Sequence, residues 1–326
     1  MTKIRWGICS TGNIAHKFAS DIPFVEETEI VAVGSRRKED AERFGKTFNI
    51  PHRHASYEAL AADSDVDVVY IGTPHSFHHE HTLLFLNAGK SVLCEKPFAI
   101  NAKQTQEMID AARKNNVFLM EAHWTHFLPG MKEMQRMIRE GVIGQVRMID
   151  ASFCYYKDYD SQDLAFNPDL GGGALLDVGV YPLALAHMIL GFPIETKSVW
   201  IPTPDGVDGV NALLCRFENG AIGQFASAVH LRRPVEALIV GDKGWIKLTE
   251  PFYKAENLTV RIGEKEAKTY RFPVKGGGYG YEAEEVVRCL QAGKKESPVV
   301  SLDFTLKMMQ MLDTIRAEWG LKYPME

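Results

Sequence analysis

The chain lacks any paired-cysteine motif. Its five cysteines are odd in number and scattered over 326 residues, and no two stand in a Cys-x-x-Cys pair. Such a pattern indicates neither a disulfide framework nor a cysteine-rich zinc site. We interpret all five as reduced thiols. They are Cys9, Cys94, Cys154, Cys215 and Cys289.

The sequence also lacks a strong charge of one sign and a long apolar run. A net charge of -5 and a pI near 6.1 offer no basic field for nucleic acid or an anionic membrane. No apolar run approaches the roughly 18 residues that span a bilayer, and the first residues carry no apolar secretory signal. We therefore expect a cytoplasmic protein without nucleic-acid or membrane partners.

A strand, a tight turn and a helix begin the chain. Residues 4–9 alternate as a strand does, and a helical pattern follows the turn. The dinucleotide fingerprint places Gly-x-Gly-x-x-Gly/Ala at such a junction, so that backbone and helix N-terminus approach a pyrophosphate. Ser10, Gly12 and Ala15 occupy the three positions, and a second strand at 29–33 has the spacing of a βαβ unit. The expected cofactor contacts here are Ser10, Thr11, Gly12, Asn13 and Ile14.

The residues after the second strand favour NADP over NAD. An NAD site places an acid there for the ribose hydroxyls, whereas an NADP site places cations for the 2′-phosphate. Here Gly34 is followed by Ser35, Arg36 and Arg37, and no acid occurs before Glu39. We predict that Ser35, Arg36 and Arg37 bind NADP. The alternative is that these cations only open the next helix in solvent.

Two further apolar strands end in polar residues, which we place at the carboxyl edge of the same sheet. Residues 67–72 and 91–94 read as buried parallel strands, and alternating helices between them predict a doubly wound α/β sheet in a domain of residues 1–121. Ligands bind at the carboxyl ends of such strands. The expected contacts at this edge are Thr73, Pro74, His75, His78, Glu95 and Lys96.

The histidines at 75, 78, 79 and 81 invite a metal-site interpretation. The nearby Glu80 falls on a different helical face from His78, and no second cluster supplies further ligands. We predict no metal, and we expect His78 to order its turn through a ring hydrogen bond.

Lys96 and a later helix together suggest chemistry. Lys96 is either a salt-bridge partner on a rim or a catalytic amine. After three glycines at 171–173, an apolar helix to Gly191 carries Asp177 and Tyr181 on one face. Asp177 and Tyr181 are either a buried pair whose polar groups find hydrogen-bond partners in the core or part of a reaction. In the second case Lys96 holds the substrate oxygen, Tyr181 relays the proton and Asp177 accepts hydrogen bonds from adjacent hydroxyls.

The second half of the chain, residues 122–326, is predicted as a second domain. Strands at 198–201, 212–217, 221–231, 236–240, 244–248 and 258–262 alternate as in a sheet with one covered and one exposed face. A flexible glycine loop is expected at 275–280, and the last helix can pack back on the first domain. The rings expected to stack on a substrate are Trp124, Phe153, Tyr155 and Tyr156.

These motifs resemble one known family. The stretches Gly7 to Ala15, Thr73-Pro74-His75, Glu95-Lys96-Pro97 and Gly171 to Tyr181 are similar to the glucose-fructose oxidoreductase/inositol dehydrogenase/MocA family. Residues 88–97, 118–125 and 296–299 look most like its trans-1,2-dihydrobenzene-1,2-diol dehydrogenase branch, which also oxidises D-xylose with NADP. The likeness covers nearly the whole chain.

The resemblance implies a Rossmann domain joined to an α+β domain with a large open, mostly antiparallel sheet that commonly forms a homodimer. It implies Lys96 and Tyr181 as catalytic residues, with Asp177 and Trp124 at the substrate. The expected activity is NADP-dependent oxidation of a cyclic secondary alcohol or sugar hemiacetal. An NADPH-dependent keto-sugar reductase and a non-catalytic NADP-sensing regulator remain alternatives. Ser10 and His126 depart from the family pattern, so pyrophosphate placement and substrate choice stay open.

Overall fold

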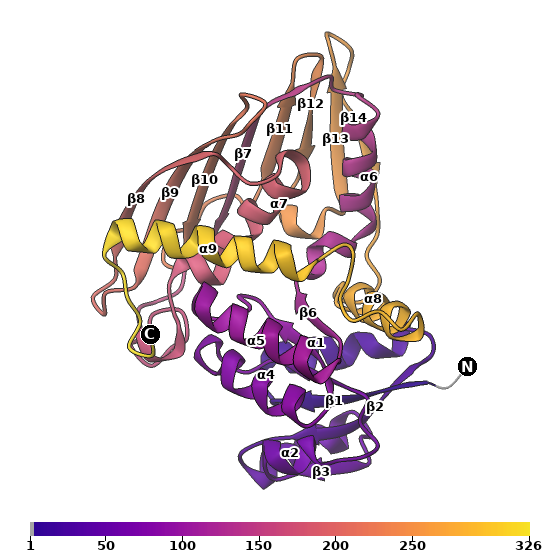
Figure 1. Cartoon of the computed structure of the whole chain (residues 1–326). Coiled ribbons are helices and arrows are strands. Elements are labelled where there is room, and N and C mark those ends of the chain that lie inside the picture. Colours follow the sequence, from indigo (N-terminus) through magenta and orange to yellow (C-terminus); the bar gives the residue numbers. More distant parts are fainter. Residues whose placement is uncertain (1–2) are drawn as a thin grey trace. The chain divides into compact units, whose positions relative to one another are not determined.

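The computed structural model describes residues 3–326 and contains two compact units (Figure 1). The first comprises residues 3–124 and 275–310, and the second comprises residues 125–274 and 311–326. The sequence-based division assigned all of 122–326 to one domain, apart from a returning last helix. The structure instead counts the whole segment 275–310 with the first unit. Met1 and Thr2, which were expected to lead into the first strand, lie outside the described residues.

The first unit contains a six-stranded parallel sheet in the order β3-β2-β1-β4-β5-β6. The order reverses between β1 and β4, which creates the switch point where doubly wound sheets bind ligands. Strands β4 and β5 are buried throughout, as their apolar runs predict. The bounds are β1 Ile4–Cys9, β2 Thr28–Gly34, β3 His52–His54, β4 Val68–Ile71, β5 Ser91–Glu95 and β6 Leu119–Ala122. The predicted doubly wound sheet is confirmed.

Helices alternate with these strands, and α4 and α5 lie side by side (Figure 1). The helices are α1 Asn13–Asp21, α2 Lys38–Thr47, α3 Tyr57–Ala61, α4 His78–Asn87, α5 Ala102–Asn115 and α8 Gly280–Gln291, with α9 Leu302–Trp319 shared between the units. Short 3-10 turns occur at Ile22–Phe24, His75–Phe77, Trp124–Phe127, Pro168–Leu170 and Phe252–Lys254.

The glycine loop before α8 is anchored, contrary to the expectation of a flexible loop. The carboxylate of Asp21 accepts main-chain N–H bonds from Gly277 at 2.8 Å, Tyr279 at 2.7 Å and Gly280 at 3.3 Å. A carboxylate at the start of a helix satisfies N–H groups that have no partner within the helix. Asp21 stands more than 250 positions earlier in the chain, so no local pattern announces this contact.

The second unit contains an eight-stranded sheet in the order β14-β13-β12-β11-β7-β10-β9-β8. Only the β7–β10 pair is parallel, so the expected mostly antiparallel sheet is confirmed. Helices α6 Pro129–Arg139 and α7 Val180–Leu190 pack against it (Figure 1). The strands are β7 Val146–Cys154, β8 Glu195–Pro202, β9 Asp208–Arg216, β10 Ile222–Ala228, β11 Ala237–Gly241, β12 Gly244–Leu248, β13 Asn257–Ile262 and β14 Lys268–Arg271.

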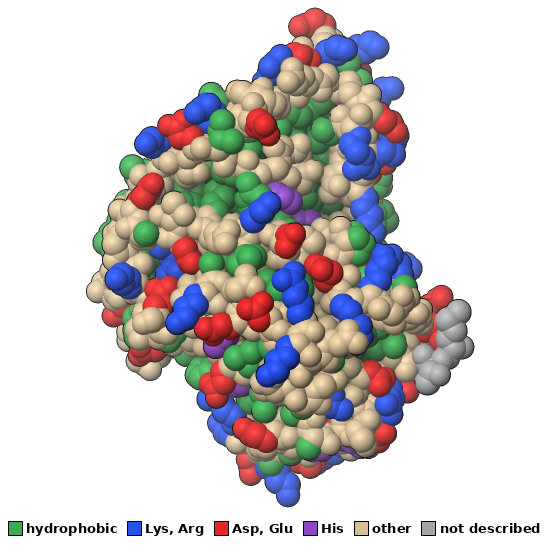
Figure 2. All heavy atoms as spheres, viewed as in Figure 1, with side chains coloured by type: hydrophobic (Ala, Val, Ile, Leu, Met, Phe, Trp, Pro, Cys, Tyr) green, Lys and Arg blue, Asp and Glu red, His purple; other side chains and the backbone are tan. Residues whose placement is uncertain are grey.

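One stretch is more apolar than we expected from the sequence. Pro168–Leu190 is long and apolar enough to cross a membrane, with a mean hydropathy of 1.6 over its most apolar window. However, 72% of that window is buried inside the protein, as in the core helix of a globular domain. On the face drawn in Figure 2, basic and acidic side chains are interspersed, in keeping with the weak net charge.

Candidate active site

A hollow of about 520 Å³ opens in the first unit beside the carboxyl ends of β1, β2 and β4. Seven residues predicted to bind the cofactor line it: Ser10, Thr11, Ser35, Arg36, Arg37, Thr73 and Pro74. Four lining residues were missed by the sequence reasoning: Asp40, Tyr57, Phe77 and His81. The hollow lies at the switch point of the sheet, where a dinucleotide is expected.

Ser10 adopts a glycine-like backbone in the first turn. Its φ is 116°, a region that L-residues rarely occupy. Its hydroxyl oxygen accepts the N–H of Gly12 at 3.1 Å, which closes the turn. Gly12 is the residue before α1, and a Cβ added there would meet only the Ser10 Oγ at 3.5 Å. Asn13 and Ile14 form the first turn of α1. The space over Gly12 is therefore open for a ligand.

The two arginines after β2 have different partners. Arg37 donates from Nε to Asp40 Oδ2 at 2.5 Å, and Arg43 also pairs with Asp40. The Arg36 guanidinium instead lies 5.5 Å from the centre of the Phe77 ring. Among residues 3–326, no acid forms an ion pair with Arg36. Of the two arginines, Arg36 is thus the one without an acidic partner among the described residues.

Aromatic rings form the wall of the hollow that the sequence reasoning missed. His81 meets Tyr57 edge to face at 4.6 Å and lies parallel to Phe77 at 5.7 Å. Burial raises the pKa of Tyr57 to about 12, so its hydroxyl stays protonated. Tyr57 begins α3 behind the cap residue Ser56, which accepts the Ala59 N–H. The capping serine was the available signal for this helix start.

His78 orders the cofactor edge from within the core. Its Nδ1 lies 2.8 Å from the Pro97 carbonyl and its Nε2 lies 2.8 Å from the Thr73 carbonyl. Burial lowers its pKa to about 3, so the neutral ring carries one N–H and donates to one of the two carbonyls at a time. The expected ring hydrogen bond is confirmed. His78 is fully buried, so its ring bonds order the turn from beneath, and its predicted contact with the cofactor stays a prediction.

Glu95 and Lys96 end β5 beside a second buried acid. Glu95 is 4% exposed, accepts the Tyr70 hydroxyl at 2.5 Å and accepts the Lys96 main-chain N–H at 3.2 Å. Burial raises the pKa of Glu95, and it raises that of Glu121, at the end of β6, to about 7. The charge of Lys96 lowers both values. Lys96 therefore stands among buried carboxyl groups, and Glu95 is directed at Tyr70 and at its own turn.

Trp124 also belongs to the first unit. Its ring packs on Tyr279 with centroids 4.9 Å apart, and only 2% of the residue is exposed. Tyr279 is held by the Asp21 anchor described above. In the structure, then, the predicted substrate residue Trp124 is covered by a ring from the glycine loop.

In the second unit, a π-helical turn carries Asp177. Leu175–Gly179 is π-helical and continues into α7, which carries Tyr181. Asp208 anchors this turn by accepting the Leu175 N–H at 2.7 Å. The sequence predicted an ordinary helix here, but π turns are rare and frequently lie at functional sites. Gly173, with a φ of 109°, permits the entry, since a Cβ there would stand 2.3 Å from Asp208.

Aromatic rings surround the two polar side chains of this turn. Tyr155 donates its hydroxyl to Asp177 Oδ2 at 2.8 Å. The Phe153 ring lies 5.2 Å from Tyr181 and is stacked on Tyr253 at 4.8 Å. Burial, together with the charge of Asp177, raises the pKa of Tyr155, so that Tyr155 remains a donor. Asp177 and Tyr181 are both partly exposed, and Tyr253 was missed by the sequence reasoning.

Comparison with known proteins places both units in one family. A model described as an oxidoreductase family with an NAD-binding Rossmann fold matches residues 4–123. A GFO/IDH/MocA C-terminal domain model matches residues 131–247. A 3-ketoreductase from Actinomadura kijaniata, solved with NADP and TDP-benzene, superposes with a TM-score of 0.88 at 26% identity, covering 97% of this chain and 98% of that one.

Curated relatives are similar over nearly the full length. The trans-1,2-dihydrobenzene-1,2-diol dehydrogenase of Danio rerio is 37% identical and covers 98% of each chain. The human protein of that name is 34% identical and covers 99% of each chain. Together with the parallel sheet, its hollow and the second mixed sheet, these matches show that the chain belongs to the GFO/IDH/MocA family of NAD(P)-binding oxidoreductases.

Proposed function

We propose that the protein is an NADP-dependent oxidoreductase for a cyclic secondary alcohol or a sugar hemiacetal. The substrate is an aldose such as D-xylose or a trans-dihydrodiol. The observation that carries the proposal is the anchored π turn and the start of α7, which present Asp177 and Tyr181 among aromatic rings. Rings of this kind stack on the apolar faces of sugars and dihydrodiols.

The residues of the hollow fit NADP better than NAD. A guanidinium offers a planar fork of donors for a 2′-phosphate, and Arg36 has no acidic partner among the described residues. No carboxylate ends β2, where an NAD site would hold the ribose hydroxyls. Gly12 and the start of α1 suit a pyrophosphate. When bound, NADP supplies the carbon that accepts or returns the hydride.

Lys96 and Tyr181 would handle the proton. We assign to the Lys96 ammonium the stabilisation of negative charge on the substrate oxygen, since a fixed cation beside a developing oxyanion lowers the barrier. Tyr181 would take the hydroxyl proton as the hydride leaves carbon, and would return it in the reverse direction. Glu95 would hold the Lys96 main chain in place through its 3.2 Å hydrogen bond.

Asp177 would position the substrate. One of its oxygens already accepts the Tyr155 hydroxyl at 2.8 Å. A carboxylate has further acceptor sites, which would bind the hydroxyl groups next to the reacting carbon. Tyr155 would keep the carboxylate in one orientation.

The relatives support this assignment. The relatives from Danio rerio and human are named as dihydrodiol dehydrogenases, and the 3-ketoreductase was solved with NADP. Solved variants of that ketoreductase carry a replacement of a single tyrosine or a single lysine. The two side-chain types to which we give the proton chemistry are thus ones substituted in a solved relative.

A substrate screen tests the proposal. Purified enzyme would be assayed for NADPH formation with aldoses, inositols and trans-dihydrodiols, and for NADPH consumption with keto-sugars. Turnover of an aldose or dihydrodiol supports the proposed dehydrogenase. Turnover only with keto-sugars supports the reductase alternative. Tight NADP binding without turnover of any of these substrates would contradict both and favour a non-catalytic sensor.

We also propose that two copies meet through the exposed face of the second sheet. Val199 is 70% exposed, Ile201 is 60% exposed and Leu214 is 54% exposed, on the adjacent strands β8 and β9. Exposed apolar surface of this kind marks interaction sites. Light scattering should give the mass of a dimer, and Leu214→Glu should give a monomer; a monomeric native protein contradicts the proposal.

We also propose that the protein resides in the cytoplasm. Its five free, buried cysteines suit that reducing compartment.

A further inference from the structure

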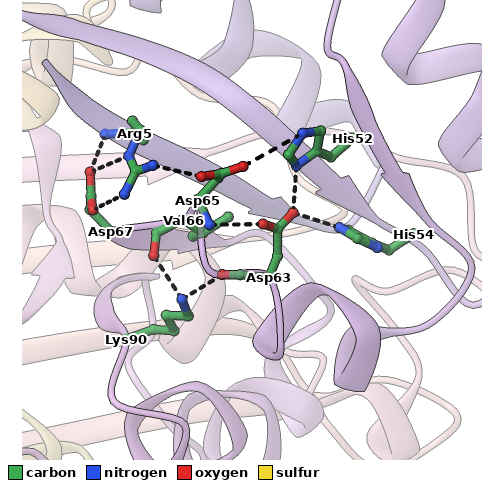
Figure 3. Close-up of polar contacts among 8 residues, drawn as sticks. All are labelled: Arg5, His52, His54, Asp63, Asp65, Val66, Asp67 and Lys90. Atoms are coloured by element: carbon green, nitrogen blue, oxygen red, sulfur yellow. Dashed lines mark hydrogen bonds and ion pairs between the residues drawn. The ribbon is translucent and has the colours of Figure 1, made fainter.

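Two histidines and an aspartate converge at the edge of the first unit's sheet, on the edge strand β3. His52 and His54 point to the same side of β3, because alternate residues of a strand share a face. His52 Nδ1 and His54 Nε2 each lie 2.8 Å from Asp63 Oδ2 (Figure 3). Within residues 3–326 this is the one group of three such side chains whose ligand atoms all lie within 4.8 Å of one another.

We propose that His52, His54 and Asp63 bind a divalent transition-metal ion of the zinc class. Two imidazole nitrogens and one carboxylate oxygen are ligands that Zn²⁺ prefers, at about 2.0–2.2 Å from the ion. Ligands of a tetrahedral ion at that distance stand roughly 3.3 Å apart. In the structure Asp63 Oδ2 lies 2.8 Å from each of the two imidazole nitrogens, and all three ligand atoms lie within 4.8 Å of one another. Small side-chain shifts would therefore bring them to the distances that the ion requires. Each neutral imidazole would turn its unprotonated nitrogen to the ion and carry its proton on the other ring nitrogen.

The loop that carries the carboxylate is already held in place. Lys90 Nζ donates to the main-chain carbonyls of Asp63 at 2.5 Å and of Val66 at 2.8 Å. Asp63 Oδ1 accepts the Asp65 N–H at 2.9 Å, which leaves Oδ2 toward the histidines. Asp65 also faces His52 Nε2 at 3.8 Å. A carboxylate behind a ligand imidazole orients the ring and strengthens its donation to a metal.

The local charge favours a cation. Three carboxylates and two cationic side chains meet here, which leaves one negative charge when the imidazoles are neutral. The carboxylates belong to Asp63, Asp65 and Asp67, and the cations to Arg5 and Lys90 (Figure 3). Arg53, between the two histidines on β3, pairs with Glu42 at 3.0 Å. The side chains of His52 and His54 are 38% and 24% exposed, so an ion can enter from solvent.

The site would brace the strand next to the cofactor pocket. The His54 carbonyl accepts the main-chain N–H of Ser35 at 3.2 Å, and within residues 3–326 β3 pairs with β2 alone. An ion that ties His52 and His54 to Asp63 would therefore fix an edge strand of three residues to the loop behind it. This cluster is separate from the histidines at 75–81, and the proposal departs from the sequence-based prediction that the chain binds no metal. It does not depend on the proposed activity.

Metal titration of the full chain tests the proposal. Protein without an affinity tag would be stripped with a chelator and titrated with Zn²⁺ by calorimetry and with Co²⁺ by visible absorption. We expect saturation at one ion per chain, Co²⁺ bands of a low-coordinate nitrogen and oxygen site, and a melting temperature that rises with Zn²⁺. His52→Gln and Asp63→Asn should each weaken binding at least about ten-fold, since even partners behind a ligand have effects of that size.

A matched variant controls for incidental histidine binding. His79→Gln removes a histidine that pairs with the single carboxylate of Glu107 at 2.8 Å, and its Zn²⁺ affinity should equal that of the wild type. Circular dichroism of each metal-free variant establishes that it is folded. Absence of saturable Zn²⁺ binding in the wild-type protein would overturn the proposal, and this measurement needs no variant. So would equal affinity in wild type, His52→Gln and Asp63→Asn.

Discussion

The cofactor hollow and the π turn are built in opposite ways. In the hollow, main-chain turns at strand ends surround the space, and the Arg36 charge lies over a ring instead of beside an acid. In the π turn, side chains from elsewhere in the second unit hold the chain: Tyr155 donates to Asp177, and Asp208 accepts the Leu175 N–H. The hollow therefore leaves the Arg36 charge available for a ligand. The π turn holds Asp177 in one orientation before any ligand binds, and such preorganisation is what the proposed reaction would require.

The largest expected effect is at Tyr181, on α7 directly after the π turn. Tyr181→Phe should lower kcat by roughly 10²-fold or more, because a general acid/base contributes about that much. The dissociation constant for NADP should hardly change, because Phe lacks only the hydroxyl that we assign to proton transfer. Steady-state kinetics and fluorescence titration measure the two. Tyr159→Phe, which removes an exposed hydroxyl bonded to Asp205, is the control and should retain activity. Equal turnover in Tyr181→Phe would remove the phenol from the chemistry.

A smaller effect is expected in the hollow. Arg36→Ala should raise the KM for NADP by about 10- to 100-fold, the scale of charge-assisted hydrogen bonds to a phosphate. The KM for NAD should hardly change, since NAD has no 2′-phosphate. Arg43→Ala controls for lost charge, because Arg43 pairs with Asp40 and does not line the hollow. A native enzyme that prefers NAD would refute the assignment.

Each unit contains a buried acid whose raised pKa makes the stability of the fold depend on pH. Burial raises the pKa of Glu121 in the first unit and of Asp208 in the second to about 7, above their ordinary values. A raised acid pKa stabilises the fold below the ordinary value, and this stability is lost as pH rises through 7. Glu121→Gln and Asp208→Asn should match the wild type in free energy of unfolding at pH 5 and exceed it at pH 8, by up to a few kcal/mol. Variants that are less stable at pH 8 would contradict these pKa directions.

The smallest effect is expected at the first turn of the chain. Ser10→Gly relieves a φ of 116° but loses the hydrogen bond to Gly12, so stability should change by less than about 1 kcal/mol. Ser10→Ala keeps the strained backbone and loses the same bond, so it should be the less stable variant. Thermal denaturation measures both. A more stable Ser10→Ala would mean that the positive φ carries little strain.

Local patterns predicted the hollow better than the π turn. The strand, turn and helix around Gly12 and the cations after β2 lie within a few residues of each other, so their spacing announces them. The spacing of Asp177 and Tyr181 was also readable. The π turn was not, because the same apolar run suits an ordinary helix.

Long-range partners escaped prediction in both units. Asp208 bonds Leu175 across 33 positions, and Asp21 anchors the glycine loop from the far end of the chain. Tyr253 reaches Phe153 from a short 3-10 turn. β3 has only three residues, too few for a periodic signal, which hid the convergence of His52 and His54.

A double-mutant cycle on Lys96 and Tyr181 tests most directly whether the two units serve one reaction. The kcat/KM values of Lys96→Met, Tyr181→Phe and the double variant would be compared with that of the wild type. Groups that act on the same proton transfer are strongly non-additive. We therefore predict that the double variant is about as slow as the slower single variant. Losses that multiply would show that the lysine and the tyrosine act independently, and would contradict the proposed mechanism.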